Sequence, residues 1–209
     1  MIENRLLETA IKQFGRNGLE GASTRTIAKA AGTAMSSITY HYGGKEGLYL
    51  AAADHIARQI REQMTPIMST MLAEPQNLAP EEAASCIVMV VDRLAQILLG
   101  RESANWAGFI VREQMQPTEA FERLYSGAMG PMMALLAGLV QTATGMTDRQ
   151  EIRLLVLTIV GQVLVFRAAH ATTLHVLELT SIDEATGAAI RARIQNNVKA
   201  ILAAARGEA

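Results

Sequence analysis

The sequence contains one cysteine, five prolines in 209 residues, and aromatic side chains at only 4% of positions. A single cysteine excludes an internal disulfide framework and is typical of proteins in a reducing compartment. The N-terminal residues also lack the basic and apolar regions of a secretory signal. We therefore expect a cytoplasmic protein. Because proline is the strongest helix breaker, its scarcity favours helices.

Half of the residues are hydrophobic, and alanine, leucine, isoleucine, valine and 11 methionines supply most of that apolar mass. Alanine, leucine and methionine are strong helix formers, and no segment reads convincingly as a strand, so we predict an all-α fold. The net charge is −1, but residues 1–50 hold six basic and four acidic side chains. This small local excess gives weak support to a phosphate-facing surface near the N-terminus.

Two short helices are expected near the N-terminus. Thr24 is the expected N-cap of the first, which ends at Gly32, and the second covers residues 35–42. Two short helices separated by about three or four residues, one of them glycine, match the helix-turn-helix layout. In this motif the first helix braces the backbone, while the second presents its outer face to the major groove of DNA.

The second short helix would turn Ile38 and Tyr42, and Met35 in part, toward the protein. Its outer face would offer short hydroxyls and two rings that can reach phosphates or base edges. The residues of that outer face are Ser36, Ser37, Thr39, Tyr40 and His41. Spacing alone would also suit an ordinary three-helix packing unit.

This segment closely resembles the DNA-binding domain of the TetR family of regulators, over about residues 5 to 50. The resemblance rests on the co-occurrence of TRTIA from Thr24, ITYHY from Ile38 and GKEGLY from Gly44. Tyr42 stands where the family more often has phenylalanine. The resemblance implies an N-terminal three-helix domain and a larger helical domain for ligand binding and dimerisation. The DNA contacts that it implies are Thr24, Arg25, Ser36, Ser37, Tyr40, His41 and Lys45.

A second resemblance is narrower. Residues 109–121, which read FIVREQMQPTEAF, look like the hallmark segment of the CerR/CecR-type C-terminal domain, found in a subgroup of TetR-like regulators. Some members of that subgroup respond to small toxic compounds. The resemblance therefore implies a small apolar or drug-like effector, although one segment does not identify it.

Aromatic and methionine side chains would form adaptable apolar walls of an effector pocket. The candidate lining residues are Trp106, Phe109, Arg112, Glu113, Phe121, Tyr125, Met133, Gln162, Phe166 and His170. The last three follow one another at i, i+4 spacing on one helix face. The alternative is that the apolar members fill the core, and that neighbours or solvent satisfy the polar ones.

Residues 154–166 form the most apolar run of the chain. The run is shorter than the roughly 20 residues of a membrane span, and it has too little polar face for a helix covered by solvent. Together with the terminal helix from about Asp183, it would form a four-helix interface between two chains, rather than one buried helix in a monomer. The expected interface residues are Leu154, Leu157, Gly161, Leu164, Ile190, Ile194, Val198 and Ile201.

Other helix boundaries follow from breakers and caps. We expect the first helix to stop at Gly15 and Gly18, and the long helix after the motif to be interrupted at Pro66 and again over residues 74–80. Thr147 and the glutamine three residues later have the form of a capping box at the start of the apolar helix.

These observations predict a DNA-binding domain over residues 1–46 and a ligand-binding and dimerisation domain over residues 47–209. The expected function is a transcription regulator, by family habit a repressor, that binds double-stranded operator DNA as a homodimer. A small-molecule effector of unknown identity would release it by favouring a spacing of the two recognition helices that does not suit the operator.

Two rival functions stay open. One is a helix-turn-helix protein that binds DNA without an inducer. The other is an enzyme or small-molecule carrier, although no nucleophile stands with a base and an orienting acid at recognisable positions. We expect no cofactor and no metal, since His55 and His175 lack partners at metal-ligand spacing. Cys86 lies in an apolar run without a neighbouring cation, which favours a packing role over a redox role.

Overall fold

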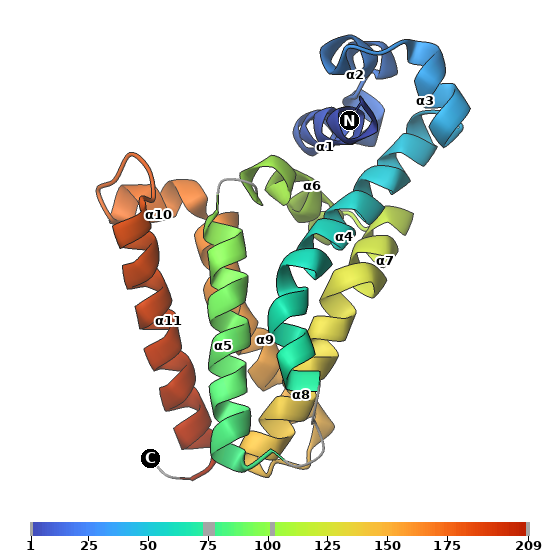
Figure 1. Ribbon diagram of the computed structural model, residues 1–209. Helices are drawn as coiled ribbons and strands as arrows, with labels where there is room; N and C mark the ends of the chain where they lie inside the picture. The colour runs from blue at the N-terminus through green and yellow to red at the C-terminus, as the bar shows by residue number, and fades with distance from the viewer. Residues whose placement is uncertain (1, 73–77, 101–102, 208–209) are drawn as a thin grey trace. The chain divides into compact units, whose positions relative to one another are not determined.

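The computed structural model describes residues 2–72, 78–100 and 103–207, and over these ranges it is helical, with no strand (Figure 1). This confirms the all-α prediction. The helices are α1 (Ile2–Gly21), α2 (Thr24–Ala31), α3 (Met35–Tyr42), α4 (Lys45–Leu72), α5 (Pro80–Leu99), α6 (Ser103–Met115), α7 (Glu119–Leu124), the π-helical turn η1 (Tyr125–Met129), α8 (Gly130–Thr144), α9 (Arg149–Ala168), α10 (His170–Val176) and α11 (Glu184–Ala205).

Packing divides the chain into two units. The first unit comprises Met1–Arg61 and Arg101–Gly130, and the second comprises Glu62–Gly100 and Pro131–Ala209. The first unit thus adds α6, α7 and η1 to the N-terminal helices. These two units are defined by contacts between residues. The predicted boundary after residue 46 instead separates a DNA-binding function from ligand binding and dimerisation. That functional boundary stays a prediction.

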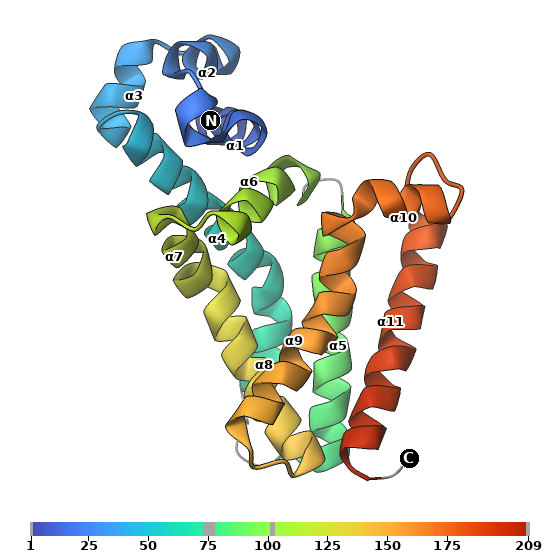
Figure 2. The same cartoon turned by 180° about the vertical axis from the view of Figure 1, so that it is seen from behind.

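The first unit is built around a core to which α1, α2, α3, α4 and α6 contribute side chains. Phe14, Ile27, Ile38, Leu48 and Phe109 are each buried to 1% exposure or less. Figure 2 shows α7 running alongside the first half of α4, and an ion pair of 2.7 Å between Arg123 Nη1 and Asp54 Oδ2 joins these two helices.

Helices α1 and α6 cross in backbone contact. A Cβ on Gly15 would lie 3.0 Å from the Phe109 nitrogen, and one on Gly108 would lie 3.3 Å from the Gly15 carbonyl oxygen. Glycine at both positions therefore permits a closer approach than side chains would allow. Gly18 is not helical, with φ 71° and ψ 179°, and it divides Ile2–Gly21 into a long helix and a short helical turn that ends at Gly21. The helix therefore passes through Gly15, where a stop was predicted, and breaks at Gly18, as predicted.

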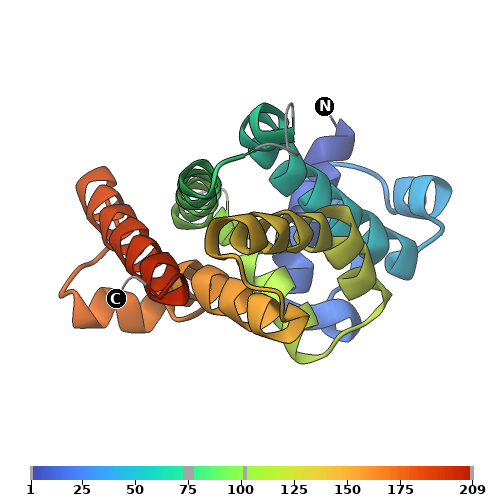
Figure 3. The same ribbon diagram turned by 90° about the horizontal axis from the view of Figure 1, so that it is seen from below.

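The second unit packs α5, α9 and α11 against one another, as the end-on view in Figure 3 shows. Polar side chains form hydrogen bonds between the elements of this unit. Asp92 on α5 accepts hydrogen bonds from Arg191 and from Gln195 on α11, at 3.1 Å and 2.8 Å. Near the end of α11, Arg206 donates to the carbonyl groups of Ala143 and Pro80. The apolar stripe of α11 faces this core.

Two predicted boundaries shift, and a third falls mostly outside the described residues. Helix α4 continues through Pro66 because that turn is anchored: Met64 is 2% exposed, and Arg93 Nε donates to the Gln63 carbonyl oxygen at 2.9 Å. At α9 the N-cap is Asp148 rather than Thr147, since its carboxylate accepts from the two backbone amides that follow the first helical residue. A carboxylate there also matches the positive end of the helix dipole. The predicted break over residues 74–80 falls mostly on residues 73–77, outside the described residues.

One helical stretch, Glu119–Thr144, is long and apolar enough to cross a membrane by length and composition alone, and two bent helix pairs would qualify if each were one span. Part of this stretch is buried within the protein, and part of it carries charged side chains. Its α8 part buries one stripe that includes Leu136 and Val140, and its first turns carry the ion pair of Arg123 with Glu119. A helix that buries one stripe of its side chains in this way is packed against protein along that stripe.

Candidate DNA-binding surface

Helix α2 is held at both ends by specific contacts. Its N-cap is Ser23, whose hydroxyl accepts from the Thr26 amide at 3.4 Å, so the predicted cap at Thr24 was one residue late. Its C-cap, Gly32, adopts the left-handed conformation (φ 67°), which glycine reaches without a steric penalty. Arg5 Nε on α1 donates to the Ala31 carbonyl oxygen at 2.7 Å. Helix α2 is therefore fixed to α1 where the turn begins.

Helix α3 follows after this turn and presents a polar outer face. Ile38 is its buried residue, at 1% exposure, and seats the helix on the first unit. Tyr40 is 85% exposed, and its ring meets the His41 ring edge to face at a centroid distance of 4.9 Å. Tyr40 therefore presents its ring and its hydroxyl to solvent beside the ring of His41. Such rings and hydroxyls are suited to phosphate and base contacts.

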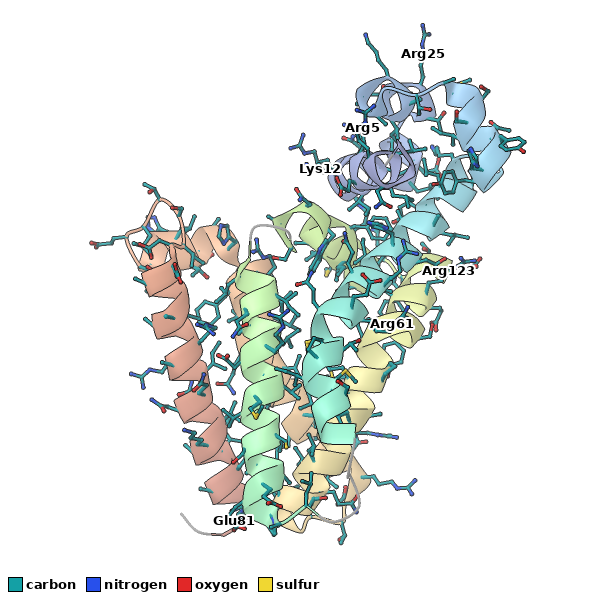
Figure 4. The ribbon with its side chains drawn as sticks, viewed as in Figure 1. Arg5, Lys12, Arg25, Arg61, Glu81 and Arg123 are labelled. Atoms are coloured by element: carbon teal, nitrogen blue, oxygen red, sulfur yellow. The ribbon has the colours of Figure 1, made fainter. Side chains whose placement is uncertain are left out.

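The predicted contact residues fall into two groups. Ser36, Thr39, Tyr40 and His41 on α3 are exposed, as is Arg25 on α2, which Figure 4 shows extending away from the helix. The remaining three, Thr24, Ser37 and Lys45, are half-buried.

Two of the half-buried residues, Ser37 and Lys45, have local partners. Ser37 accepts a hydrogen bond from the Thr33 hydroxyl at 3.2 Å, across the first turn of α3. Lys45 Nζ donates to the Glu20 carbonyl oxygen at 3.1 Å, which places its ammonium at the negative end of α1. Lys45 therefore links α4 to α1, and its two further N–H donors are not used by that bond.

The segment that contains α2 and α3 carries basic side chains and no acidic ones. Residues 22–45 contain Arg25, Lys29, His41 and Lys45 but no aspartate or glutamate. A region without acids avoids repulsion of the DNA backbone even though the whole chain is slightly acidic. Lys29, exposed in the last turn of α2, was missed as a candidate contact, and this acid-free stretch is the signal that would have found it.

A buried polar cluster joins α4, α6 and α7 beneath the motif. The Tyr49 hydroxyl donates to Glu113 Oε1 at 2.5 Å, and Glu113 Oε2 accepts from the Thr118 amide and hydroxyl at 3.0 Å and 2.9 Å. The Tyr49 ring packs against Phe14 on α1 and Phe109 on α6, with centroids 4.9 Å and 4.6 Å away. Burial, and then the bond to Glu113, raise the pKa of Tyr49 well above its ordinary value. This cluster connects the helix that follows the motif to α6.

We expect Tyr49→Phe to lower the free energy of unfolding by about 1–3 kcal/mol, because it leaves a buried carboxylate oxygen without its donor. The raised pKa of Tyr49 also makes its contribution to the free energy of unfolding depend on pH. It contributes stability that is complete below pH of about 10, the ordinary tyrosine pKa, and that is lost as pH rises further. Urea unfolding across pH 8–11 should show a steeper alkaline loss in the native chain than in the variant. Tyr125→Phe, at a tyrosine 46% exposed, is the matched control and should change neither quantity.

The candidate lining residues of the effector pocket divide between the two units. Several members on α6 fill the core of the first unit. Phe109 is fully buried, Trp106 is 3% exposed, and both oxygens of Glu113 are occupied, so Glu113 is a structural anchor rather than an open group. Tyr125 is exposed and stacks on Phe121 at a centroid distance of 6.0 Å. The described residues form two surface grooves among others, and Arg112 is the one member of the ten candidate lining residues that lines either of these two.

Four of these candidates lie in the second unit, and all four are half-buried: Met133, Gln162, Phe166 and His170. Gln162 Oε1 accepts from Asn197 at 3.1 Å, but its Nε2 is buried without a partner among the described residues. Nδ1 of His170 is in the same condition. Buried polar atoms without partners are uncommon and leave hydrogen-bonding capacity for a bound molecule or water.

The predicted dimer residues separate clearly by exposure. Leu154, Leu157 and Leu164 on α9 are 54%, 58% and 46% exposed, and Gly161 has open space where a Cβ would stand. On α11, by contrast, the stripe that was expected to meet a partner lies in the chain's own core. Ile190, Ile194 and Val198 have exposures of 7%, 2% and 0%, and Ile201 is half-buried. Those three buried residues cannot supply surface to a second chain, because α5 and α9 already cover them.

Two family models match the chain. The model of bacterial regulatory proteins of the tetR family matches residues 6–52. The model of the C-terminal domain of the HTH-type transcriptional dual regulator CecR matches residues 83–205. Together they cover both the helix-turn-helix and most of the remaining chain.

Individual relatives agree with these models. The chain is 34% identical over 189 residues to the HTH-type transcriptional dual regulator CecR of Shigella flexneri, covering 87% of this chain and 82% of that protein. A TetR-family transcriptional regulator from Streptomyces coelicolor superposes with a TM-score of 0.65 at 16% identity, over 98% of this chain and 96% of that one. FadR from Bacillus subtilis in complex with stearoyl-CoA superposes with a TM-score of 0.60 at 15% sequence identity, over 99% of each chain. At these identities the two structures show the likeness of fold alone.

Proposed function

Because the chain belongs to the TetR family of bacterial regulatory proteins and carries a CecR-type C-terminal domain, we propose that it is a ligand-responsive repressor. It binds operator DNA as a homodimer in the cytoplasm and leaves the operator when a small apolar or drug-like molecule binds. The family consists of DNA-binding transcription regulators, in agreement with the prediction of a regulator rather than an enzyme.

The observation that carries this proposal is the acid-free surface of α2 and α3. Tyr40 and His41 enter the major groove from α3, and Ser36 and Thr39 add hydroxyl contacts beside them. Arg25 on α2, with Lys29 and Lys45, contacts the phosphates on either side. The phosphate contacts supply affinity and the α3 contacts supply sequence selectivity.

The exposed leucines of α9 support a homodimer. Leu154, Leu157 and Leu164 lie at spacings of three and seven residues, which places them along one face of the helix. Gly161 in the same stretch would let the helix of a second chain approach closely. The interface that we propose therefore centres on α9. Two chains related by a twofold axis present two recognition helices about 34–36 Å apart, one turn of DNA.

The effector acts through helices that connect its site to the motif. Unpartnered polar atoms of Gln162 and His170 favour a site along α9 and α10 for the predicted effector, with Phe166 as an apolar wall. An effector releases DNA only if it binds more tightly to the chain when the recognition helices have a spacing unsuited to the operator. The Tyr49–Glu113 bond between α4 and α6 is the contact that would transmit such a change within the first unit.

Selection of DNA from a random pool by the full-length chain tests the DNA-binding part of the proposal. The expected result is a palindromic consensus whose half-sites are one helical turn apart. Enrichment of a single asymmetric half-site would contradict a dimeric mode, and absence of enrichment at low salt would contradict DNA binding itself.

A thermal-shift screen of drug-like compounds, followed by an operator-release assay, tests the response to a ligand. We expect at least one compound that both raises the melting temperature and releases the selected operator. If stabilising compounds leave the complex with DNA intact, the protein is instead a constitutive DNA binder without an inducer.

A further inference from the structure

A groove of about 400 Å³ lies on the first unit where α1 and α6 cross. Its volume falls within the range of small-molecule sites, about 300–1,000 Å³. The backbone contact of the two helices forms one side of it. The groove is lined by Gly15, Gly108, Val111, Arg112, Met115 and Gln116. None of the polar atoms of Gln162 and His170 belongs to this groove.

Arg112 brings a positive charge to this groove without a protein partner. Within the described residues its guanidinium makes no hydrogen bond or ion pair, and its Nε is buried without an acceptor. The group lies directly on the backbone of α1, since a Cβ on Gly18 would be 3.0 Å from Nη1. The neighbouring carboxylate of Glu113 is already occupied by Tyr49 and Thr118. A half-buried guanidinium whose Nε has no acceptor favours a bound anion.

The other wall of the groove is apolar and exposed. Met115 is 78% exposed and Val111 is 42% exposed, both on α6 beside Arg112. A methionine side chain adapts its shape to the molecule that it covers. The lining contains no aromatic ring, so it suits an aliphatic body better than a stacked ring.

We propose that this groove binds a small aliphatic carboxylate. The carboxylate accepts hydrogen bonds from the Arg112 guanidinium, and the alkyl chain covers Val111 and Met115. Such a ligand contacts α6 and, through Gly15, the helix α1 that precedes the DNA-binding motif. Its influence on operator binding rests on the proposed function, whereas the binding itself does not.

Titration of the full-length chain with sodium octanoate tests the proposal directly, with 1-octanol as the uncharged probe of equal chain length. Trp106 is the only tryptophan, and it lies on α6 close to Gly108, so its fluorescence reports binding without DNA. We expect saturable binding of octanoate and at least about tenfold weaker binding of the alcohol, since the alcohol lacks the charge-assisted bonds.

Substitutions in the groove test whether octanoate binds there. Arg112→Gln should weaken octanoate binding about tenfold or more, and Arg112→Lys should restore much of it. Met115→Glu, at an exposed position that leaves the fold intact, should also abolish binding by repelling the carboxylate. Arg149→Gln is the matched control, an exposed arginine at the start of α9, and should bind octanoate as the native chain does.

Absence of saturable octanoate binding, or equal binding by the native chain, Arg112→Gln and Met115→Glu, would overturn the proposed groove. An anisotropy assay with the selected operator separates this outcome from failure of the proposed function. Octanoate binding that depends on Arg112, in a chain that selects no DNA, supports the groove and contradicts the repressor.

Discussion

The double variant Tyr40→Ala/His41→Ala is expected to lose selective binding to its operator by about 100-fold or more while it stays folded and dimeric. Each base contact contributes about 1–3 kcal/mol of discrimination, and a homodimer loses it at both half-sites. The fold should tolerate the change because Tyr40 is 85% exposed and His41 is exposed as well. Fluorescence anisotropy with the selected operator and a scrambled duplex, at one fixed salt concentration, measures the ratio.

Two further variants sharpen this test. His175→Ala removes an exposed histidine on α10, which belongs to the second unit, and should leave operator binding unchanged. Lys29→Ala should weaken binding to operator and scrambled DNA alike and reduce the salt dependence, since a phosphate contact carries no sequence information. Selective binding that survives the Tyr40/His41 double substitution in a folded chain would show that α3 is not the recognition helix.

The second large effect is expected from Leu154→Glu combined with Leu157→Glu. In the proposed dimer both leucines are covered by the partner, so the variant would bury carboxylates without partners on each side of the interface. We expect a monomer at micromolar concentration, and a loss of operator affinity of at least about 100-fold, because one chain contacts only one half-site. Sedimentation velocity measures the first quantity and anisotropy the second.

Met89→Glu is the control for this experiment. Met89 is 46% exposed on α5 and offers a similar apolar surface outside α9, so the variant should stay dimeric. If the α9 variant also stays dimeric and folded, the exposed leucines are not the interface, and another surface must join the two chains.

Local sequence signals were sufficient to predict the helix-turn-helix. Gly32 and Gly43 end their helices in the left-handed conformation, so both boundaries were visible as glycines. The cap of α2 was less certain, because Ser23 and Thr24 carry equivalent hydroxyls and only the backbone conformation separates them. The contact residues that this motif predicts still await the DNA-binding experiments.

Contacts between distant parts of the chain were not predictable in the same way. The apolar stripe through Ile194 and Val198 was recognised, but period alone does not tell whether a neighbouring helix or a second chain covers it. The polar position of Glu113 was also noticed, yet its partner Tyr49 lies 64 residues away. Pro66 gave a local signal for a break that tertiary anchoring of its turn overrides.

The contact between Gly15 and Gly108 has a mechanical consequence. Side chains between two helices can change rotamer and absorb a small displacement, but here backbone lies against backbone with nothing compressible between. A displacement of α6 toward α1 therefore has to displace α1 as well. The contact is stiff because no side chain separates the two backbones, and α1 is part of the predicted DNA-binding domain.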